Sequence, residues 1–246
     1  MDASNRSDRL VAAAESGGGI VILAGAGMSA ESGVPTFRGA DGLWRNFRAE
    51  DLATPGAFAR DPVLVWEWYE WRRGLVAECE PNAAHSAVTE LENRVTGSFL
   101  LVTQNVDGLH RVAGTRNYRE VHGCLWETRC LGCGDVVERR DHPLGELPPK
   151  CTCGGTLRPN VVWFGENLPE ATLSSAFAAA GECDVMVVAG TSGVVYPIAH
   201  LPRIAKDAGG YVIEVNLERT PISTLADEVH LGPAGEVLPD LVGVTF

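Results

Sequence analysis

The sequence predicts an α/β fold, in which a Rossmann-like doubly wound parallel sheet carries a small lobe made of a zinc ribbon and a helical insertion. Short apolar runs rich in β-branched residues alternate with helical segments, which is typical of a parallel sheet covered by helices on both faces. The first run leads directly into a glycine-rich turn, and four cysteines lie in two close pairs. These features predict a ligand crevice at the carboxyl ends of the strands and a separate metal site.

The order of the elements follows from hydrophobic periodicity and from the residues that interrupt it. A first helix begins near Ser7 or Asp8, either of which can cap it, and stops at the glycines that start with Gly17. Buried strands are expected at four apolar runs: 20–24, 99–103, 184–189 and 211–215. Helices are expected at three segments between them: 82–95, 169–181 and 197–208.

Two stretches interrupt this alternation. Residues 40–80 are helical and rich in tryptophan, and residues 124–160 carry the cysteine cluster. Both are expected to be insertions that cover one edge of the ligand crevice. We therefore expect one domain over residues 1–246, composed of a large lobe (1–39, 81–123 and 161–246), the helical insertion (40–80) and the zinc-ribbon module (124–160).

Composition and charge exclude several classes of protein. The chain has 32 acidic and 20 basic residues, a net charge of −12 and 45% hydrophobic residues, enough for a sizeable core. No run approaches the ~18 apolar residues of a membrane span, and the N-terminus lacks the layout of a signal peptide. We expect a monomeric cytoplasmic protein that binds neither membranes nor nucleic acids, because its acidic surface repels phosphates and favours lysine-rich partners.

The glycine-rich turn at residues 25–33 (GAGMSAESG) follows the first strand. Glycines here permit a tight turn and a close approach of the backbone to a pyrophosphate. The third glycine comes later than in the usual G-x-G-x-x-G pattern, and the ribose-binding acid about 20 residues further on is not evident. From spacing alone, a dinucleotide-binding loop and a structural turn both remain open.

Polar residues follow the second expected strand. Gln104, Asn105 and Asp107 suit ribose hydroxyls and a carboxamide, and the alternative is a turn that caps the next helix. His122 lies at an expected strand end, where an imidazole that titrates near neutral pH can take a proton from a ribose hydroxyl. A lone histidine is otherwise structural, which is the role we assign to His110.

The cysteine spacing predicts a structural zinc site. Cys130-x2-Cys133 is followed, after 17 intervening residues, by Cys151-x-Cys153. Four thiolates satisfy tetrahedral zinc and leave no open position. The second pair is C-x-C where many ribbons have C-x-x-C, so His142 is an alternative ligand. A nucleic-acid-binding ribbon is disfavoured by the acidic net charge. The other three cysteines are interpreted as buried thiols: Cys79, Cys124 and Cys183.

Six stretches, together with the cysteines, resemble in order the motifs of the sirtuins, the NAD-dependent protein deacylases. They are 25–39 (GAGMSAESGVPTFRG), 103–110 (TQNVDGLH), 121–123 (VHG), 161–166 (VVWFGE), 190–192 (GTS) and 215–218 (VNLE). The resemblance extends from about residue 17 to the C-terminus. It implies NAD as cofactor, one structural zinc ion, and His122 as the general base beside Asn105 and Asp107.

The resemblance also implies which residues contact NAD. Phe37 would shield the reacting ribose carbon from water, and Arg38 would lie near the phosphates. The implied set is Gly25, Ala26, Gly27, Met28, Ser29, Ala30, Glu31, Pro35, Thr36, Phe37, Arg38, Trp44, Gln104, Asn105, Val106, Asp107, Gly190, Thr191, Ser192, Asn216, Leu217, Glu218 and Ala234.

The implied reaction removes an acyl group from a protein lysine. The acyl oxygen attacks C1′ of the nicotinamide ribose, nicotinamide leaves, and His122 helps a ribose hydroxyl to take over the acyl group. The products are nicotinamide, O-acyl-ADP-ribose and free lysine. The substrate peptide would bind as an added strand between the loop 194–197 and a second strip: Val161, Trp163, Phe164, Gly165 and Glu166.

The acyl group is predicted from one helix of the insertion. Tyr69 and Arg72 stand at i and i+3 and share a helix face; the alternative is an ordinary amphipathic helix. The Tyr-x-x-Arg pattern resembles the sirtuins that remove succinyl, malonyl and glutaryl groups, in which the pair binds the acyl carboxylate. Ala30 would keep the pocket roomy. Removal of acetyl groups alone, mono-ADP-ribosyl transfer, NAD hydrolysis and a non-enzymatic NAD-sensing scaffold remain open alternatives.

Overall fold

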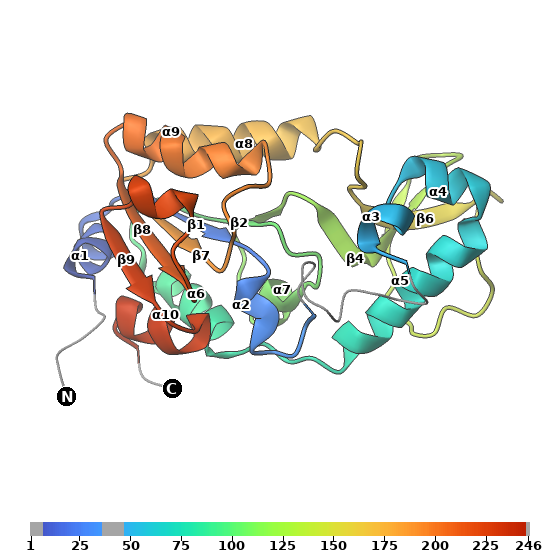
Figure 1. Ribbon diagram of the computed structural model, residues 1–246, viewed down its shortest axis with the longest axis horizontal. Coiled ribbons are helices and arrows are strands. Elements are labelled where there is room, and N and C mark those ends of the chain that lie inside the picture. Colours follow the sequence, from blue (N-terminus) through green and yellow to red (C-terminus); the bar gives the residue numbers. More distant parts are fainter. Residues whose placement is uncertain (1–6, 36–46, 245–246) are drawn as a thin grey trace.

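The computed structural model describes residues 7–35 and 47–244, and it has a large lobe and a small lobe (Figure 1). Within these residues, a six-stranded sheet forms the centre of the large lobe, and its neighbouring strands are all parallel. Its order is β3-β2-β1-β7-β8-β9, the strand order of dinucleotide-binding domains. The strands are β1 (Ile20–Ala24), β2 (Phe99–Thr103), β3 (Tyr118–Glu120), β7 (Val185–Ala189), β8 (Tyr211–Asn216) and β9 (Glu228–Leu231).

Helices cover both faces of this sheet, because successive side chains of a strand point to opposite faces. On one face, α1 (Asp8–Ser16), α6 (Ala83–Arg94) and α10 (Ala234–Val242) share a hydrophobic core with Ile20 and Ile22. On the other face, α8 (Glu170–Glu182) and α9 (Leu201–Asp207) pack with Val21 and Leu23. Figure 1 shows α8 and α9 side by side, across the sheet from α6 and α10. The doubly wound α/β fold expected from the sequence is therefore confirmed.

The caps of the first helices follow from their sequence. The Ser7 side chain accepts a hydrogen bond from the Leu10 N–H at the start of α1, and Gly17 ends that helix with a φ of 85°. Asn82 caps α6 in the same way. These residues fix where each helix begins and ends, so the observed bounds differ from the expected ones by a residue or so.

The expected helix 197–208 is interrupted near its start. A 3-10 turn, η2 (Ile198–His200), comes first, and α9 begins only at Leu201. Pro202 has no N–H to donate to the Ile198 oxygen, so a regular α-helical turn cannot form there. The strand end expected at His122 corresponds to β3, which ends at Glu120. Strand β9 and helix α10 were not among the expected elements, and a short helix, α7 (Leu109–Val112), follows Asp107 as expected.

The two predicted insertions form the small lobe together. The helical one contributes α3 (Ala49–Leu52), α4 (Pro55–Arg60) and α5 (Pro62–Ala77). The cysteine-containing one contributes an antiparallel sheet in the order β5-β4-β6, with β4 at Gly123–Cys130, β5 at Val136–Glu138 and β6 at Leu157–Val161. A third hydrophobic core joins them, in which Trp66 and Trp68 of α5 pack with Leu125, Trp126 and Trp163.

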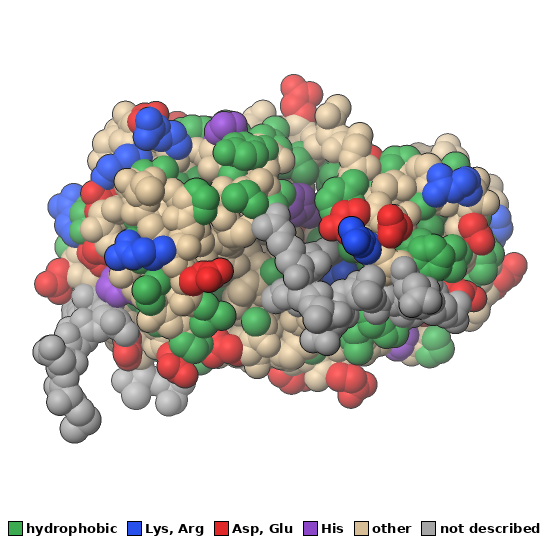
Figure 2. All heavy atoms as spheres, in the orientation of Figure 1, with side chains coloured by type: hydrophobic (Ala, Val, Ile, Leu, Met, Phe, Trp, Pro, Cys, Tyr) green, Lys and Arg blue, Asp and Glu red, His purple; other side chains and the backbone are tan. Residues whose placement is uncertain are grey.

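The surface carries both signs of charge. In the face shown in Figure 2, Lys and Arg side chains appear as separate spots, and Asp and Glu side chains are scattered mainly along the edges. None of the helices in residues 7–35 and 47–244 combines the length and the apolar character needed to cross a bilayer. The surface shown therefore presents no continuous band of positive charge.

Candidate active site

The strand order reverses between β1 and β7, so the loops after these strands frame the crevice in which folds of this kind bind ligands. The Gly27 N–H donates to the Gly190 oxygen at 2.8 Å across this junction. A Cβ atom at Gly25 would lie 2.6 Å from the Gly190 oxygen, and one at Gly190, where φ is +61°, would lie 2.5 Å from the Met28 nitrogen. The glycines are therefore required because the two loops contact each other through their backbones.

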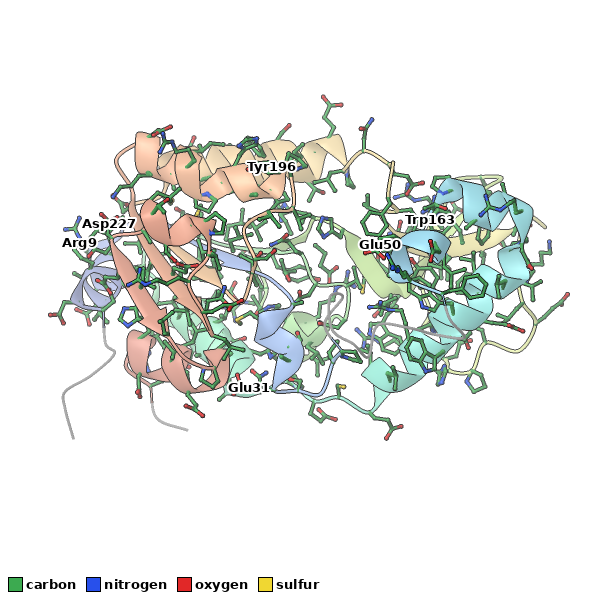
Figure 3. All side chains as sticks on the ribbon, viewed as in Figure 1. Arg9, Glu31, Glu50, Trp163, Tyr196 and Asp227 are labelled. Carbon is green, nitrogen blue, oxygen red and sulfur yellow. The ribbon has the colours of Figure 1, made fainter. Side chains whose placement is uncertain are left out.

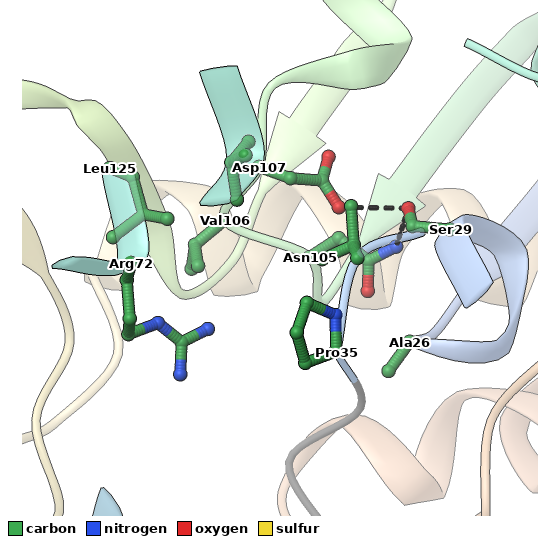
Figure 4. Close-up of a pocket in the computed structure, with 10 residues that line it drawn as sticks. Ala26, Ser29, Pro35, Arg72, Asn105, Val106, Asp107 and Leu125 are labelled. Atoms are coloured by element: carbon green, nitrogen blue, oxygen red, sulfur yellow. Dashed lines mark hydrogen bonds between the residues drawn. The ribbon is translucent and has the colours of Figure 1, made fainter. Parts of the chain in front are cut away.

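A buried cluster of polar side chains lies beside this junction (Figure 4). Ser29 Oγ donates to Asp107 Oδ2 at 2.8 Å, and Asn105 Nδ2 donates to Ser29 Oγ at 3.1 Å. Asn105 Nδ2 also donates to the Gly25 oxygen at 3.0 Å, which ties the cluster to the glycine loop. Burial raises the pKa of Asp107, while its hydrogen bonds and the charge of Arg72 lower it. The cluster thus holds an amide and a carboxylate in fixed orientations at the crevice.

His85 belongs to this cluster and was not predicted from the sequence. Its Nε2 lies 3.4 Å from Ser29 Oγ, and its ring centroid lies 4.7 Å from that of His110. Burial lowers the pKa of His85 to about 4 and that of His110 well below its usual value, so both rings are neutral at physiological pH. The available signal was the capping spacing Asn82-x-x-His85 at the start of α6, which the structure contains.

His122 lies in the short connection between β3 and β4, directly before Gly123. Its Nδ1 lies 3.0 Å from the main-chain oxygen of Gln104. A carbonyl oxygen can only accept, so Nδ1 carries the proton of the neutral ring and Nε2 is left as the basic atom. Burial lowers the pKa of His122, and the bond to Gln104 opposes that change. The geometry therefore provides a neutral imidazole that can take a proton.

Several residues expected to contact the cofactor form hydrogen bonds that connect the ends of three strands. Gln104 Nε2 donates to Thr191 Oγ1 at 2.9 Å, and Asn216 Nδ2 donates to the Thr191 oxygen at 2.8 Å. These bonds connect the ends of β2, β7 and β8 along the carboxyl edge of the sheet. Ala234 is buried at the start of α10, whereas three neighbours of the crevice are exposed: Ser192, Leu217 and Glu218.

Other expected cofactor residues occupy different environments. The Met28 side chain is buried in the core, and Ala30 is exposed on α2 (Gly27–Ala30) and does not line the pocket, so the expectation that it widens the acyl pocket is not supported. The Glu31 carboxylate accepts from the Gly235 N–H at 2.7 Å and so caps α10 (Figure 3). Four expected residues lie outside the described residues: Thr36, Phe37, Arg38 and Trp44.

A pocket connects the polar cluster with the helical insertion (Figure 4). Arg72 of α5 lines one side, and Ser29, Asn105 and Asp107 line the other. Burial lowers the pKa of Arg72, and its charge interactions with Tyr69 and Asp107 oppose this change. The rest of the described wall is apolar: Ala26, Val34, Pro35, Val76, Val106 and Leu125. The pocket therefore holds the Arg72 guanidinium beside an apolar wall and opposite the polar cluster.

Tyr69 is buried next to this pocket and does not line it among the described residues. Its hydroxyl oxygen accepts a hydrogen bond from Trp163 Nε1 at 2.8 Å. Burial raises the pKa of Tyr69 to about 12, so the hydroxyl keeps its proton at physiological pH. Of the expected pair, Arg72 alone reaches the pocket wall, and Tyr69 lies behind it on the same helix face.

The strip expected to bind the substrate peptide is anchored to the general base and to the insertion. The Val162 N–H donates to the His122 oxygen, and the Phe164 N–H donates to the Ala53 oxygen, both at 2.9 Å. Phe164 is exposed, whereas Trp163 is buried. Trp163 is labelled in the small lobe in Figure 3. Across the crevice loops, the expected partner strip is also exposed: Val194, Val195 and Tyr196.

The four cysteines of the small lobe fit a zinc ion. Their sulfur atoms all lie within 4.8 Å of one another, and two pairs are 3.5 and 3.8 Å apart. A tetrahedral site with Zn–S bonds of about 2.3 Å needs sulfur atoms about 3.8 Å apart. The N–H groups of Cys133 and then Gly132 hold the pKa of Cys130 at about 6, which favours the thiolate that binds metal. Sulfur ligands alone complete the site.

His142 does not join these cysteines. Its Nδ1 lies 3.4 Å from Glu70 Oε2, and its ring packs over Gly74 of α5. The alternative in which His142 replaces a cysteine ligand is therefore not supported. Of the other three thiols, Cys124 and Cys183 are buried as expected, but Cys79 is only partly buried because it lies beyond the end of α5.

Comparison with known proteins identifies the family. The model of the Sir2 family matches residues 25–197. The chain belongs to the Sir2 family. It is 56% identical over 209 residues to an NAD-dependent protein deacylase of Aquifex aeolicus, covering 85% of this chain and 87% of that protein. Members of the family with solved structures share the architecture described above.

Several of these structures were solved with ligands. A Sir2 homologue in complex with NAD has a TM-score of 0.90 and 48% identity, covering 99% of this chain and 95% of that one. A Sir2 protein in complex with the inhibitor EX-527, 2′-O-acetyl-ADP-ribose and a deacetylated p53 peptide has a TM-score of 0.77 and 31% identity, covering 89% and 90%.

Proposed function

We propose that this protein removes acyl groups from protein lysines in an NAD-dependent reaction that gives nicotinamide, O-acyl-ADP-ribose and free lysine, with a preference for succinyl and malonyl over acetyl chains. The observation that carries the proposal is the pocket in which Arg72 lies opposite Ser29, Asn105 and Asp107. Ion-pairing and ribose-binding groups thereby meet in one cavity. The naming of relatives as NAD-dependent protein deacylases supports the reaction class.

The loops and side chains that line the crevice are suited to binding NAD. The loops after β1 and β7 meet without side chains at Gly25 and Gly190, which suits a pyrophosphate, and a buried amide and carboxylate lie beside them. When bound, NAD would supply the ribose carbon that accepts the acyl oxygen as nicotinamide leaves, and one water would be consumed when the lysine amine is later released. We assign the pyrophosphate to the glycine loop, the adenosine to the loop at Asn216, and the nicotinamide ribose and its carboxamide to Gln104, Asn105 and Asp107.

His122 acts as the general base in this proposal. Its Nε2 takes the proton of a ribose hydroxyl, because Nδ1 is already used by the Gln104 oxygen. Its neutral state requires no preceding proton loss, since burial lowers its pKa. Apolar residues on the pocket wall, such as Val106 and Leu125, keep water from the reacting centre and so disfavour plain NAD hydrolysis.

The acyl-lysine enters from the side of the small lobe. Its peptide adds as a strand beside residues 161–166, and the negative surface of the chain attracts the lysine-rich segments that carry such groups. The carboxylate of a succinyl or malonyl group is then held by the Arg72 guanidinium. A monomeric state, a cytoplasmic location and the absence of nucleic-acid and membrane partners stay predictions.

Mass spectrometry of one lysine peptide in acetyl and succinyl forms, incubated with and without NAD, tests the proposal. We expect NAD-dependent loss of the succinyl group with formation of O-succinyl-ADP-ribose, and slower loss of acetyl. Loss of acetyl alone would keep the reaction and refute the acyl preference. Release of nicotinamide without loss of either group would favour an NAD hydrolase or ADP-ribosyltransferase, and no NAD turnover would favour a scaffold.

A further inference from the structure

Trp163 links the substrate strip to the acyl-binding helix. The strip passes from β6 into the crevice, and Trp163 is the one of its residues that turns inward, with 2% of its surface exposed. Its indole Nε1 lies 2.8 Å from the hydroxyl oxygen of Tyr69, a residue 94 positions earlier in the chain. The side chain therefore contacts α5 and leaves the peptide-binding edge to its neighbours.

The direction of this hydrogen bond is fixed by chemistry. An indole N–H can only donate, so the Tyr69 oxygen must accept. The phenolic proton of Tyr69 is then not used by Trp163, and no second partner of the hydroxyl is found among residues 7–35 and 47–244. Arg72, one helical turn further along α5, interacts electrostatically with Tyr69. The proton of Tyr69 therefore has no acceptor among the described residues, and an acyl carboxylate held by Arg72 takes it by reaching past the described pocket wall toward α5, since Tyr69 does not line that wall.

The ring of Trp163 is itself held from two sides. The Arg158 guanidinium carbon lies 3.4 Å from the ring centroid, and the ring of Phe58 lies 5.2 Å from it. Arg158 also makes two hydrogen bonds to Glu166, at 2.6 and 2.9 Å, and Glu166 accepts from the Trp163 N–H at 2.9 Å. An indole clamped in this way holds its N–H in one place, at the Tyr69 oxygen.

We propose that Trp163 is a positioning residue for acyl selection: its indole N–H orients the Tyr69 hydroxyl so that the phenolic proton is donated to the carboxylate of an acyl chain bound by Arg72. The inference rests on the proposed function and adds to it the residue that makes the tyrosine a donor. It separates the role of Trp163 from that of its neighbour Phe164, whose side chain is exposed.

Trp163→Phe tests the inference, because phenylalanine keeps an aromatic ring and removes the N–H. We expect kcat/KM on the succinyl peptide to fall about 5-fold, as for the loss of one buried hydrogen bond, with less than about 2-fold change on the acetyl peptide. Tyr69→Phe should lower the succinyl value by a similar or larger factor. The double variant should be no worse than Tyr69→Phe alone, because both changes remove the same donated proton.

Trp66→Phe is the matched control. Trp66 Nε1 donates to the Leu157 oxygen at 2.9 Å in the same hydrophobic core, so its removal costs a comparable buried bond. The Trp66 ring packs edge-on against the Tyr69 ring, with centroids 6.5 Å apart, and phenylalanine keeps an aromatic ring at this contact without a bond to the Tyr69 hydroxyl. Its ratio of succinyl to acetyl activity should stay at the wild-type value. Arg158→Met, which frees the ring and keeps its N–H, should move the ratio in the direction of Trp163→Phe and provides the test if that variant does not fold.

The outcomes separate this inference from the function on which it rests. Equal losses on both peptides, or losses of Trp163→Phe and Tyr69→Phe that add, would overturn the role of Trp163 and leave the deacylase intact. A wild-type enzyme that removes neither acyl group would overturn the proposed function as well. A succinyl preference that survives in Trp163→Phe and is lost in Tyr69→Phe would show that the hydroxyl acts without this orientation.

Discussion

His122 and Gln104 are joined by a bond of 3.0 Å between the imidazole Nδ1 and the main-chain oxygen, and the side chain of Gln104 reaches Thr191 on the neighbouring loop. One residue therefore sets the tautomer of the base and ties it to the opposite wall of the crevice. Any shift of the loop after β2 would move both contacts at once.

The first prediction concerns pH. The active form of His122 is neutral, and burial lowers its pKa below the usual value of about 6.5. Protonation therefore inactivates the base only at more acidic pH than for an exposed histidine. We expect kcat/KM for deacylation to stay level from neutral pH down to about 6.5 and to fall below it, as measured between about pH 5 and 8. An acid limb centred above the usual histidine value of about 6.5 would contradict this assignment, and His122→Ala should abolish deacylation.

The second prediction concerns the acyl carboxylate. Arg72→Met should lower desuccinylation at least about 10-fold, because hydrogen bonds to a charged group contribute roughly 1.5–3 kcal/mol, and should leave deacetylation almost unchanged. Arg60→Met is the control, since Arg60 is exposed at the end of α4. Steady-state kinetics on the two forms of one peptide provide the measurement. Equal losses on both substrates would remove Arg72 from acyl recognition.

The third prediction concerns the metal. One zinc ion per chain should be found by elemental analysis, and its removal by a chelator should lower Tm by more than about 5 °C, because a chain of this size loses about 2–4 °C for each kcal/mol. Cys130→Ala should reproduce this effect. Cys79→Ser should keep both the metal and Tm, because Cys79 lies outside the cluster. Full metal content in Cys130→Ala would rule out the four-sulfur site.

The fourth prediction concerns an arginine that pairs with two glutamates. Arg111 of α7 pairs with Glu120 of β3 and with Glu127 of β4, and all three side chains are largely buried. Arg111→Met leaves two carboxylates without their cation, and we expect a loss of about 2 kcal/mol, between the values for exposed and fully buried pairs. Arg203→Met, which breaks the exposed pair with Asp207, should cost less than about 1 kcal/mol. The free energies of unfolding of the two variants are measured by chemical denaturation. Equal losses in both variants would show that the pairs of Arg111 do not stabilise the fold more than an exposed pair does.

Much of the large lobe could be predicted because its strands are buried on both faces. Residues 20–24 form a continuous apolar run, and such runs stand out in any sequence. Strand β9 and helix α10 gave no comparable signal. The strand residues 228–231 are partly exposed and mixed in polarity, and Pro239 lies within the helix. A proline in a helical pattern is normally taken as a break.

Some residues of the candidate site could likewise be predicted from the sequence, and others could not. Residues that follow a strand, such as Asn105 and Asp107, could be placed at the crevice because the carboxyl ends of parallel strands meet there. The contact of Trp163 with Tyr69 could not be predicted, because it depends on how the helical insertion packs against the segment that follows β6, 94 positions away. His85 escaped notice for a related reason: its link to Ser29 exists only once α6 lies against α2.

The shared core of the small lobe has a consequence for the exchange of segments between relatives. Because the tryptophans of α5 share one hydrophobic core with Leu125, Trp126 and Trp163, we expect that exchanging the helical segment or the cysteine-bearing segment alone with that of a relative would destabilise the small lobe. A chimera that imports one without the other would leave large aromatic rings against a surface shaped for different neighbours. The helix that carries Arg72 and the metal-bearing segment therefore form one packing unit.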